Sequence, residues 1–200
     1  FGNAAISPQT EETPFHPISP YACAKVFAHG MCTTYRAAYK MFISCGIAYN
    51  HESPRRGEEF VTRKITNAVA KIKAGQQHEL RLGDTSTRRD WSHAKDIVRG
   101  AWLALQRDTP DDYVFASGET HSVQELVELA FNYAGLNHHQ YVRIDPTLFR
   151  PTEVRLLQGL SFKATQLLGW KPTMYFSKLV QEMVEADLAA TQYHNSLEVS

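Results

Sequence analysis

The sequence predicts an α/β fold, because segments typical of strands alternate with amphipathic helical segments along its 200 residues. The most apolar run, residues 41–49, is typical of a buried parallel strand. A polar loop, residues 50–57, follows it directly. Ligands of open α/β sheets bind beyond the carboxyl ends of the strands, so this loop is the first place to look for a site.

A polar, proline-punctuated loop leads into the first expected helix, which runs from Pro20 to about Tyr39. Ser19 is a favourable N-cap residue, and proline suits the first helical position. The spacing of the apolar residues predicts a core-facing stripe. It comprises Val26, Phe27, Met31 and Tyr35.

Tyr21 and Lys25 lie four residues apart and therefore share one face of this helix. An ammonium group beside a phenol favours the phenolate, which lowers the tyrosine pKa from about 10. Such a tyrosine can act as a general base on a sugar or alcohol hydroxyl. The same spacing also occurs where the tyrosine packs and the lysine is a solvated charge, so further motifs must decide.

The next elements repeat the alternation. A helix over about residues 60–74 is expected to bury Val61, Ile65, Ala68 and Ile72, with Gly75 at its end. A short strand at 80–82 follows, and then a helix over about 93–106 with Ile97, Ala101 and Leu105 on one side. Residues 113–116 are the next strand candidate.

The remaining segment begins with Ser122 and Glu125, which form a capping box and predict a helix from Val123 to about Ala134. Residues 142–144 alternate like an edge strand, and 164–168 form a helical turn. A last amphipathic helix covers about 179–188, and the tail after Gln192 is expected to fray.

Composition excludes several classes of protein. Lys plus Arg and Asp plus Glu number 21 each, so there is no bulk basic field for nucleic acid or a membrane surface. The three cysteines lack metal-ligand spacing, and we expect no metal, no disulfide scaffold and a cytoplasmic location. A glycine-rich dinucleotide loop, Gly-x-Gly-x-x-Gly or Gly-x-x-Gly-x-x-Gly, does not occur.

Several spaced blocks together resemble the GDP-mannose 4,6-dehydratase family of extended short-chain dehydrogenases/reductases. The blocks are 19–25 (SPYACAK), 50–57 (NHESPRRG), 60–65 (FVTRKI), 89–91 with 93–96 (RDW and HAKD), 118–122 (GETHS), 150–154 (RPTEV) and 168–172 (LGWKP). Leu160 and Ser92 depart from the family pattern. The resemblance covers nearly the whole chain.

The resemblance implies a partial Rossmann fold, a doubly wound parallel sheet, with a smaller C-terminal substrate domain. Residues 1–49 and 93–117 would form the second half of the NADP-binding domain, 50–92 and 118–192 the sugar-nucleotide domain, and 193–200 a tail. About 130 further residues, holding the glycine-rich loop, would precede Phe1 as the first half of a dinucleotide fold. We therefore expect a C-terminal fragment that binds NADP poorly and turns over nothing alone.

The family's reaction converts GDP-mannose to GDP-4-dehydro-6-deoxy-mannose and water, with NADP holding a hydride transiently. By the resemblance, Tyr21 is the catalytic base, and Lys25 tunes it and holds the nicotinamide ribose. His51 and Arg56 would contact NADP. Substrate contacts would come from Asn50, Lys64, Arg89, Arg150 and Glu153. Guanidinium suits this role because its planar fork meets two phosphate oxygens at once.

The residues alone leave other interpretations open. His51, Arg56 and Lys64 could be solvated loop or surface groups, and Asn50 could serve a turn. Asp90 and Trp91 are interpreted as structural. The alternatives for function are another sugar-nucleotide epimerase or dehydratase, and a non-catalytic sugar-nucleotide-binding module. Relatives assemble as homodimers or homotetramers, which the sequence does not itself reveal.

Overall fold

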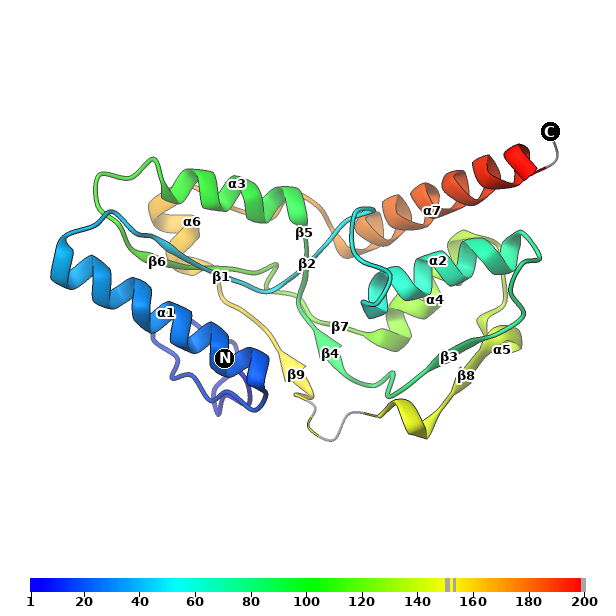
Figure 1. The fold of residues 1–200 in the computed structure, drawn as a ribbon, viewed down its shortest axis with the longest axis horizontal. Coiled ribbons are helices and arrows are strands. Elements are labelled where there is room, and N and C mark those ends of the chain that lie inside the picture. The colour runs from blue at the N-terminus through cyan, green and yellow to red at the C-terminus, as the bar shows by residue number, and fades with distance from the viewer. Residues whose placement is uncertain (150–151, 153, 199–200) are drawn as a thin grey trace. The chain divides into compact units, whose positions relative to one another are not determined.

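The computed structural model describes residues 1–149, 152 and 154–198, and side chains as far as residue 193. Helices and strands alternate (Figure 1). In chain order the elements are α1 (Pro20–Tyr39), β1 (Cys45–Ala48), β2 (Asn50–Glu52), α2 (Val61–Lys73), β3 (Leu80–Leu82), β4 (Arg88–Arg89), β5 (Trp91–His93), α3 (Ala94–Ala104), β6 (Asp112–Phe115), β7 (His121–Ser122), α4 (Val123–Tyr133), α5 (His138–Tyr141), β8 (Val142–Ile144), η1 (Pro146–Leu148), β9 (Leu156–Leu157), α6 (Phe162–Leu168) and α7 (Phe176–Glu198).

The chain divides into two compact units that alternate along the sequence. Unit 1 comprises residues 1–51, 89–120 and 152–173, and unit 2 comprises 52–88, 121–151 and 174–200. The alternation resembles that of the two expected domains, although residues 152–173 fall into unit 1. The roles assigned to the two domains stay predictions.

Unit 1 is built on the parallel pair β1 and β6, in which Cys45 pairs with Asp112 and Ala48 with Phe115. Successive side chains of a strand point to opposite faces. Tyr113 and Phe115 pack with residues of α3 and α6, including Trp170 just beyond α6. Val114 lies on the other face with Tyr49. The helix α1 lies along this second face (Figure 1).

Unit 2 is a bundle of α2, α4 and α7, which pack against one another beside the parallel pair β3 and β8. Ser122 caps α4, because its hydroxyl accepts from the Glu125 backbone N–H at 3.0 Å. Ile65, Ala68 and Ile72 of α2 are buried, as their period predicts. The predicted start of α4 at Ser122 is therefore confirmed, although the Glu125 carboxylate contacts His121 and Arg88. The predicted stripe of α2 is confirmed except at Val61, which is only half-buried.

The expected core-facing stripe of α1 is wrong. None of the residues of α1, all of which the structure describes, is buried, and Phe27 is 70% exposed. A 20-residue helix is about 30 Å long, whereas a four-residue strand spans about 13 Å. Two such strands are too small to cover the helix.

Three other expectations need correction. The strand expected to be buried within residues 41–49 is β1, and none of its residues is buried. The buried face of α3 comprises Asp96, Ile97, Gly100 and Ala104, so the exposed Ala101 and Leu105 lie off it. The expected tail from residue 193 is helical over most of its length, because α7 continues to Glu198. Among the described residues, no helix has the length and apolar character that a bilayer crossing requires.

Candidate active site

The beginning of α1 presents the expected tyrosine–lysine pair. The Ser19 hydroxyl accepts from the Ala22 N–H at 3.1 Å, and Pro20 opens the helix, so the cap directs the first turn. The Lys25 Nζ atom lies 5.5 Å from the centre of the Tyr21 ring. Tyr21 is 72% exposed, which leaves its hydroxyl accessible to a ligand.

Asn50 and His51 lie on β2, shortly after β1, and both are half-buried. The His51 Nδ1 atom is 2.9 Å from the Tyr49 carbonyl oxygen. A carbonyl only accepts, so Nδ1 carries the proton and Nε2 is the acceptor of the neutral ring. This backbone contact orients a polar ring nitrogen for a ligand.

Arg56 is held in place within unit 2. Its Nε atom lies 3.1 Å from Oε2 of the buried Glu52, and its guanidinium stacks 3.5 Å above the Phe60 ring. The Thr62 hydroxyl donates to the same Glu52 oxygen at 2.7 Å. These contacts restrict the rotamer of Arg56, so its planar fork is oriented before any anion arrives.

Lys64 lies on α2, where Nζ donates to the Arg81 carbonyl oxygen at 2.8 Å. It lines a surface hollow of ≈ 230 Å³ together with the cations Lys71 and Arg81 and the acid Glu58. Because Arg81 is paired with Glu79 at 2.7 Å, the positive balance of this hollow rests on Lys64 and Lys71 against Glu58. Its chemistry therefore suits an anionic ligand.

Arg89 ends β4 and is half-buried, immediately before the fully buried Asp90. Asp90 accepts four hydrogen bonds of 2.6–3.2 Å, from the N–H and hydroxyl of Ser117 and from the N–H groups of Gly118 and Gly159. Asp90 thus organises three backbone segments of unit 1, and with the burial of Trp91 this confirms the structural interpretation of both residues. The expected substrate residues Arg150 and Glu153 lie outside the described residues.

The structure brings Tyr21 and Lys25 together on α1, and Asn50 and His51 together on β2, all in unit 1. Arg56 and Lys64 belong to unit 2. Within unit 1 the donors include an ammonium and an oriented imidazole, a chemistry that suits phosphate and ribose groups. The residues present therefore fit a nucleotide cofactor such as NADP.

Comparison with known proteins identifies the family. The family model described as GDP-mannose 4,6 dehydratase matches residues 1–183. The chain belongs to this family. It is 54% identical over 181 residues to GDP-mannose 4,6 dehydratase 2 of Arabidopsis thaliana, covering 90% of this chain and 48% of the relative. It is 46% identical over 205 residues to the GDP-mannose 4,6 dehydratase of Homo sapiens, a match that covers 94% of this chain and 55% of the relative.

The chain spans about half the length of the curated relatives it matches. Solved structures share its α/β Rossmann fold at lower identity. RMD from Pseudomonas aeruginosa complexed with NADPH is similar with a TM-score of 0.85 and 24% identity, covering 93% of this chain and 62% of that one. The dTDP-glucose 4,6-dehydratase of Bacillus anthracis in complex with NAD is similar with a TM-score of 0.82 and 22% identity. The match covers 98% of this chain and 60% of that one.

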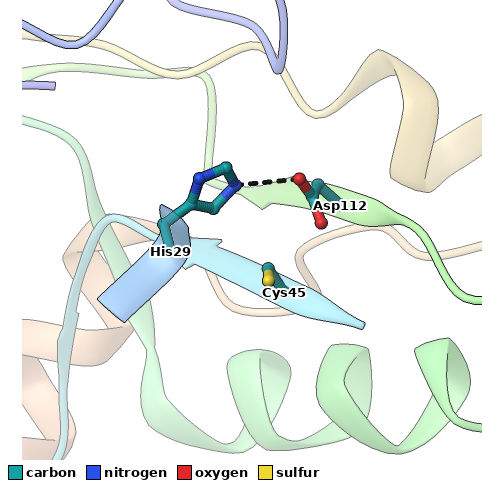
Figure 2. A group of neighbouring side chains, drawn as sticks. All are labelled: His29, Cys45 and Asp112. Atoms are coloured by element: carbon teal, nitrogen blue, oxygen red, sulfur yellow. Dashed lines mark hydrogen bonds and ion pairs between the residues drawn. The ribbon is translucent and has the colours of Figure 1, made fainter. Parts of the chain in front are cut away.

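One polar cluster was missed by the sequence analysis. His29 of α1, Cys45 of β1 and Asp112 of β6 lie together in unit 1 (Figure 2). Burial raises the pKa of the Cys45 thiol to about 12, with smaller contributions from Asp112 and Cys32. The helical spacing of His29 and Arg36 was a visible signal, but their common partner Asp112 is more than 70 residues away in sequence.

Proposed function

We propose that this chain carries the tyrosine–lysine pair and the GDP-binding residues of a GDP-mannose 4,6-dehydratase. The protein would convert GDP-mannose to GDP-4-dehydro-6-deoxy-mannose and water. The observation that carries this proposal is the exposed Tyr21 beside Lys25, in a chain that the family model matches over residues 1–183.

In this proposal Tyr21 accepts the proton of the sugar 4-hydroxyl, and the ammonium of Lys25 favours the phenolate electrostatically. NADP, when bound, would supply a transient hydride acceptor that returns the hydride within the same turnover. Lys25, His51 and Arg56 would hold this cofactor. The orientation of Arg56 by Glu52 and Phe60 supports its role, because a preoriented guanidinium loses less freedom on binding an anion.

The substrate would be bound by residues that recognise its hydroxyl and diphosphate groups. Arg89 and Arg150 are proposed to grip the GDP phosphates, and Glu153 to accept from ribose hydroxyls. Asn50 would face the sugar. The cationic hollow around Lys64 supports a place for this residue near the nucleotide. Assembly as a homodimer or homotetramer and a cytoplasmic location stay predictions.

The test separates the dehydratase from the alternatives by product mass. The protein encoded by the longest reading frame that contains this chain is purified. It is incubated in turn with GDP-mannose, UDP-glucose and dTDP-glucose. A dehydratase with the proposed specificity yields a product one water lighter, from GDP-mannose alone. An epimerase leaves the mass unchanged, and a binding module leaves the substrate untouched, so either result contradicts the proposal.

The 200-residue chain is assayed in parallel. We expect no turnover from it, since it contains no glycine-rich loop for the cofactor pyrophosphate. Robust conversion of GDP-mannose by this chain alone would contradict the expectation. It would also show that the cofactor binds through other residues of the chain.

A further inference from the structure

Three side chains with metal-binding atoms meet between α1 and the sheet of unit 1. The His29 Nε2 atom lies 2.8 Å from Oδ2 of Asp112. These two atoms and the Cys45 Sγ all lie within 4.8 Å of one another. Figure 2 shows the imidazole and the carboxylate facing each other, with the sulfur beside them. Among the described residues this is the one group of three or more such side chains.

The register of the sheet produces the arrangement. Cys45 and Asp112 are paired residues of two parallel strands, so their side chains leave the same face of the sheet next to each other. Val114, two residues after Asp112, belongs to the cluster on this face, which confirms the orientation. His29 and Arg36 lie two turns apart on the side of α1 that reaches Asp112.

We propose that His29, Cys45 and Asp112 form a binding site for a zinc ion. Imidazole, thiolate and carboxylate are the ligands that zinc prefers in proteins, at about 2.0–2.3 Å. Ligand atoms at these distances in a tetrahedral arrangement lie about 3.3–3.8 Å apart. Side-chain movements of about 1 Å would therefore bring the three atoms to ligand distance from one ion. Zinc would displace both the proton between His29 Nε2 and Asp112 Oδ2 and the proton of the Cys45 thiol, and a water would hold the fourth position.

The charges around the cluster are compatible with a dication. One carboxylate and one thiolate together balance the charge of Zn²⁺. Arg36 contacts the other oxygen of Asp112, Oδ1, and its Nε donates to the Ile43 carbonyl oxygen at 2.7 Å. Arg36 therefore orients the carboxylate from the far side, and only its weak 3.6 Å contact with the Cys45 sulfur would be displaced.

The site is accessible, because the side chains of His29 and Asp112 are 24% and 17% exposed. A metal here would also have a physical consequence. No residue of α1, described in full, is buried, and His29 and Arg36 make polar contacts from this helix to Asp112 of the sheet. A zinc ion would join α1, β1 and β6 through three strong bonds and fasten the helix that carries Tyr21 and Lys25.

The test measures zinc binding by the 200-residue chain, freed of metal and of any affinity tag. Competition with a chromophoric chelator should give one Zn²⁺ per chain. Co²⁺ in its place should give a thiolate-to-cobalt charge-transfer band. The isosteric change Cys45→Ser should abolish the band and weaken zinc binding by at least about 100-fold, since even groups behind the ligands are worth about 10- to 100-fold.

Cys23→Ser is the matched control, because Cys23 is exposed on the same helix. It should leave the stoichiometry and the band unchanged. His29→Gln, with a circular dichroism spectrum to confirm folding, should lose zinc affinity as Cys45→Ser does. Substoichiometric zinc, equal affinity in Cys45→Ser, or loss of the band in Cys23→Ser would overturn the proposal and leave the cluster as an ion pair only. Because metal binding is read directly, failure here leaves the proposed dehydratase activity untouched.

Discussion

At the scale of single residues, the relative placement of Tyr21 and Lys25 depends on a single turn of helix. The Ser19 cap and Pro20 fix where that turn begins, and the four-residue spacing places both side chains on one face. The tyrosine is largely exposed, so its hydroxyl is accessible to a ligand. The geometry is therefore local and can be tested by substitution.

In the protein encoded by the longest reading frame, Tyr21→Phe should lower the rate of GDP-mannose dehydration by about 10²- to 10⁴-fold. This is the usual contribution of a general base. The ring remains, so stability should not change. Product formation is measured by mass spectrometry. Tyr39→Phe, at the other end of α1 and 69% exposed, is the control and should keep full activity. Undiminished output from Tyr21→Phe would mean that the base has been misidentified.

A second residue-scale prediction concerns Glu125, which lies between His121 and Arg88 at 2.8 and 2.7 Å. Burial alone would raise the pKa of this carboxyl, but the hydrogen bonds from His121 and Arg88 outweigh burial and hold the pKa below its usual value. The unfolded chain takes up this proton near pH 4.3. Stability from Glu125 is therefore present above that pH and lost as pH falls through the lower folded pKa.

Glu125→Gln should accordingly be less stable than the unmodified chain at pH 7, and the difference should shrink as pH falls below about 4.3. Urea midpoints at neutral and acid pH measure this change. Glu128→Gln, one turn further along α4, is the control, since its carboxylate accepts from the Gln124 amide at 2.9 Å. A difference that stays constant with pH would contradict the pKa direction.

At the scale of elements, packing determines whether replacing a helical glycine by alanine stabilises or destabilises the fold. An added Cβ at Gly100 of α3 would come within 2.6 Å of the Phe115 ring, whereas at Gly30 of α1 it would meet nothing within 4 Å. Gly100→Ala should lower the free energy of unfolding, because overpacking costs about 1–3 kcal/mol and exceeds the helix-propensity gain of about 1 kcal/mol. Gly30→Ala should raise it by up to about 1 kcal/mol. Urea unfolding of both variants checks the opposite signs, and equal signs would contradict the packing of α3.

The contact between α2 and α7 includes a largely buried ion pair. Arg63 meets Asp187 through Nη2 and Nε at 2.7 and 2.8 Å, and the Thr66 hydroxyl donates to Asp187 at 2.7 Å. The side chains are only 17% and 4% exposed, so Asp187→Ala leaves a buried cation without its anion. We expect a loss of about 3–5 kcal/mol in the free energy of unfolding.

Chemical unfolding measures the cost of Asp187→Ala. Glu185→Ala is the control, because this exposed carboxylate of α7 accepts from the Tyr133 hydroxyl and the Gln181 amide, and its loss should cost far less stability than the loss of Asp187. Equal effects of the two substitutions would show that the Asp187 pair contributes no more than a surface charge.

At the scale of the whole molecule, the chain presents a large amount of exposed apolar surface. Large apolar side chains of α1, of α3 and of the residue that follows α3 are 59–72% exposed. They are Tyr21, Phe27, Tyr39, Val98, Trp102 and Leu105. Contiguous apolar patches of several hundred Å² are uncommon on isolated proteins and promote association.

The 200-residue chain should therefore bind a hydrophobic dye strongly and associate at micromolar concentration. The double substitution Phe27→Gln and Trp102→Gln should reduce both dye fluorescence and the apparent mass in light scattering. The substitution Lys95→Gln on α3 is the control, because it removes no apolar side chain. A monodisperse monomer without dye binding would contradict the expectation that these faces attract apolar partners.

Local patterns in the sequence were sufficient to predict most elements and the placement of Tyr21 and Lys25 on one face of α1. Ser19 and Ser122 begin their helices where caps are expected, and Gly135 and Gly169, with φ of +70° and +62°, follow the ends of α4 and α6. The strand at 142–144 was located to the residue. Caps, periodicity and glycine conformations involve residues a few positions apart, so the sequence displays them directly.

Only the tertiary structure decided which helix faces are buried and which distant side chains meet. Phe27 is apolar and correctly spaced yet 70% exposed, because burial depends on the area of sheet available to the helix. His29, Cys45 and Asp112 come together through the pairing of β1 with β6, across 83 residues of sequence between His29 and Asp112. Strand register and packing partners are non-local quantities, and for that reason no local pattern could supply them.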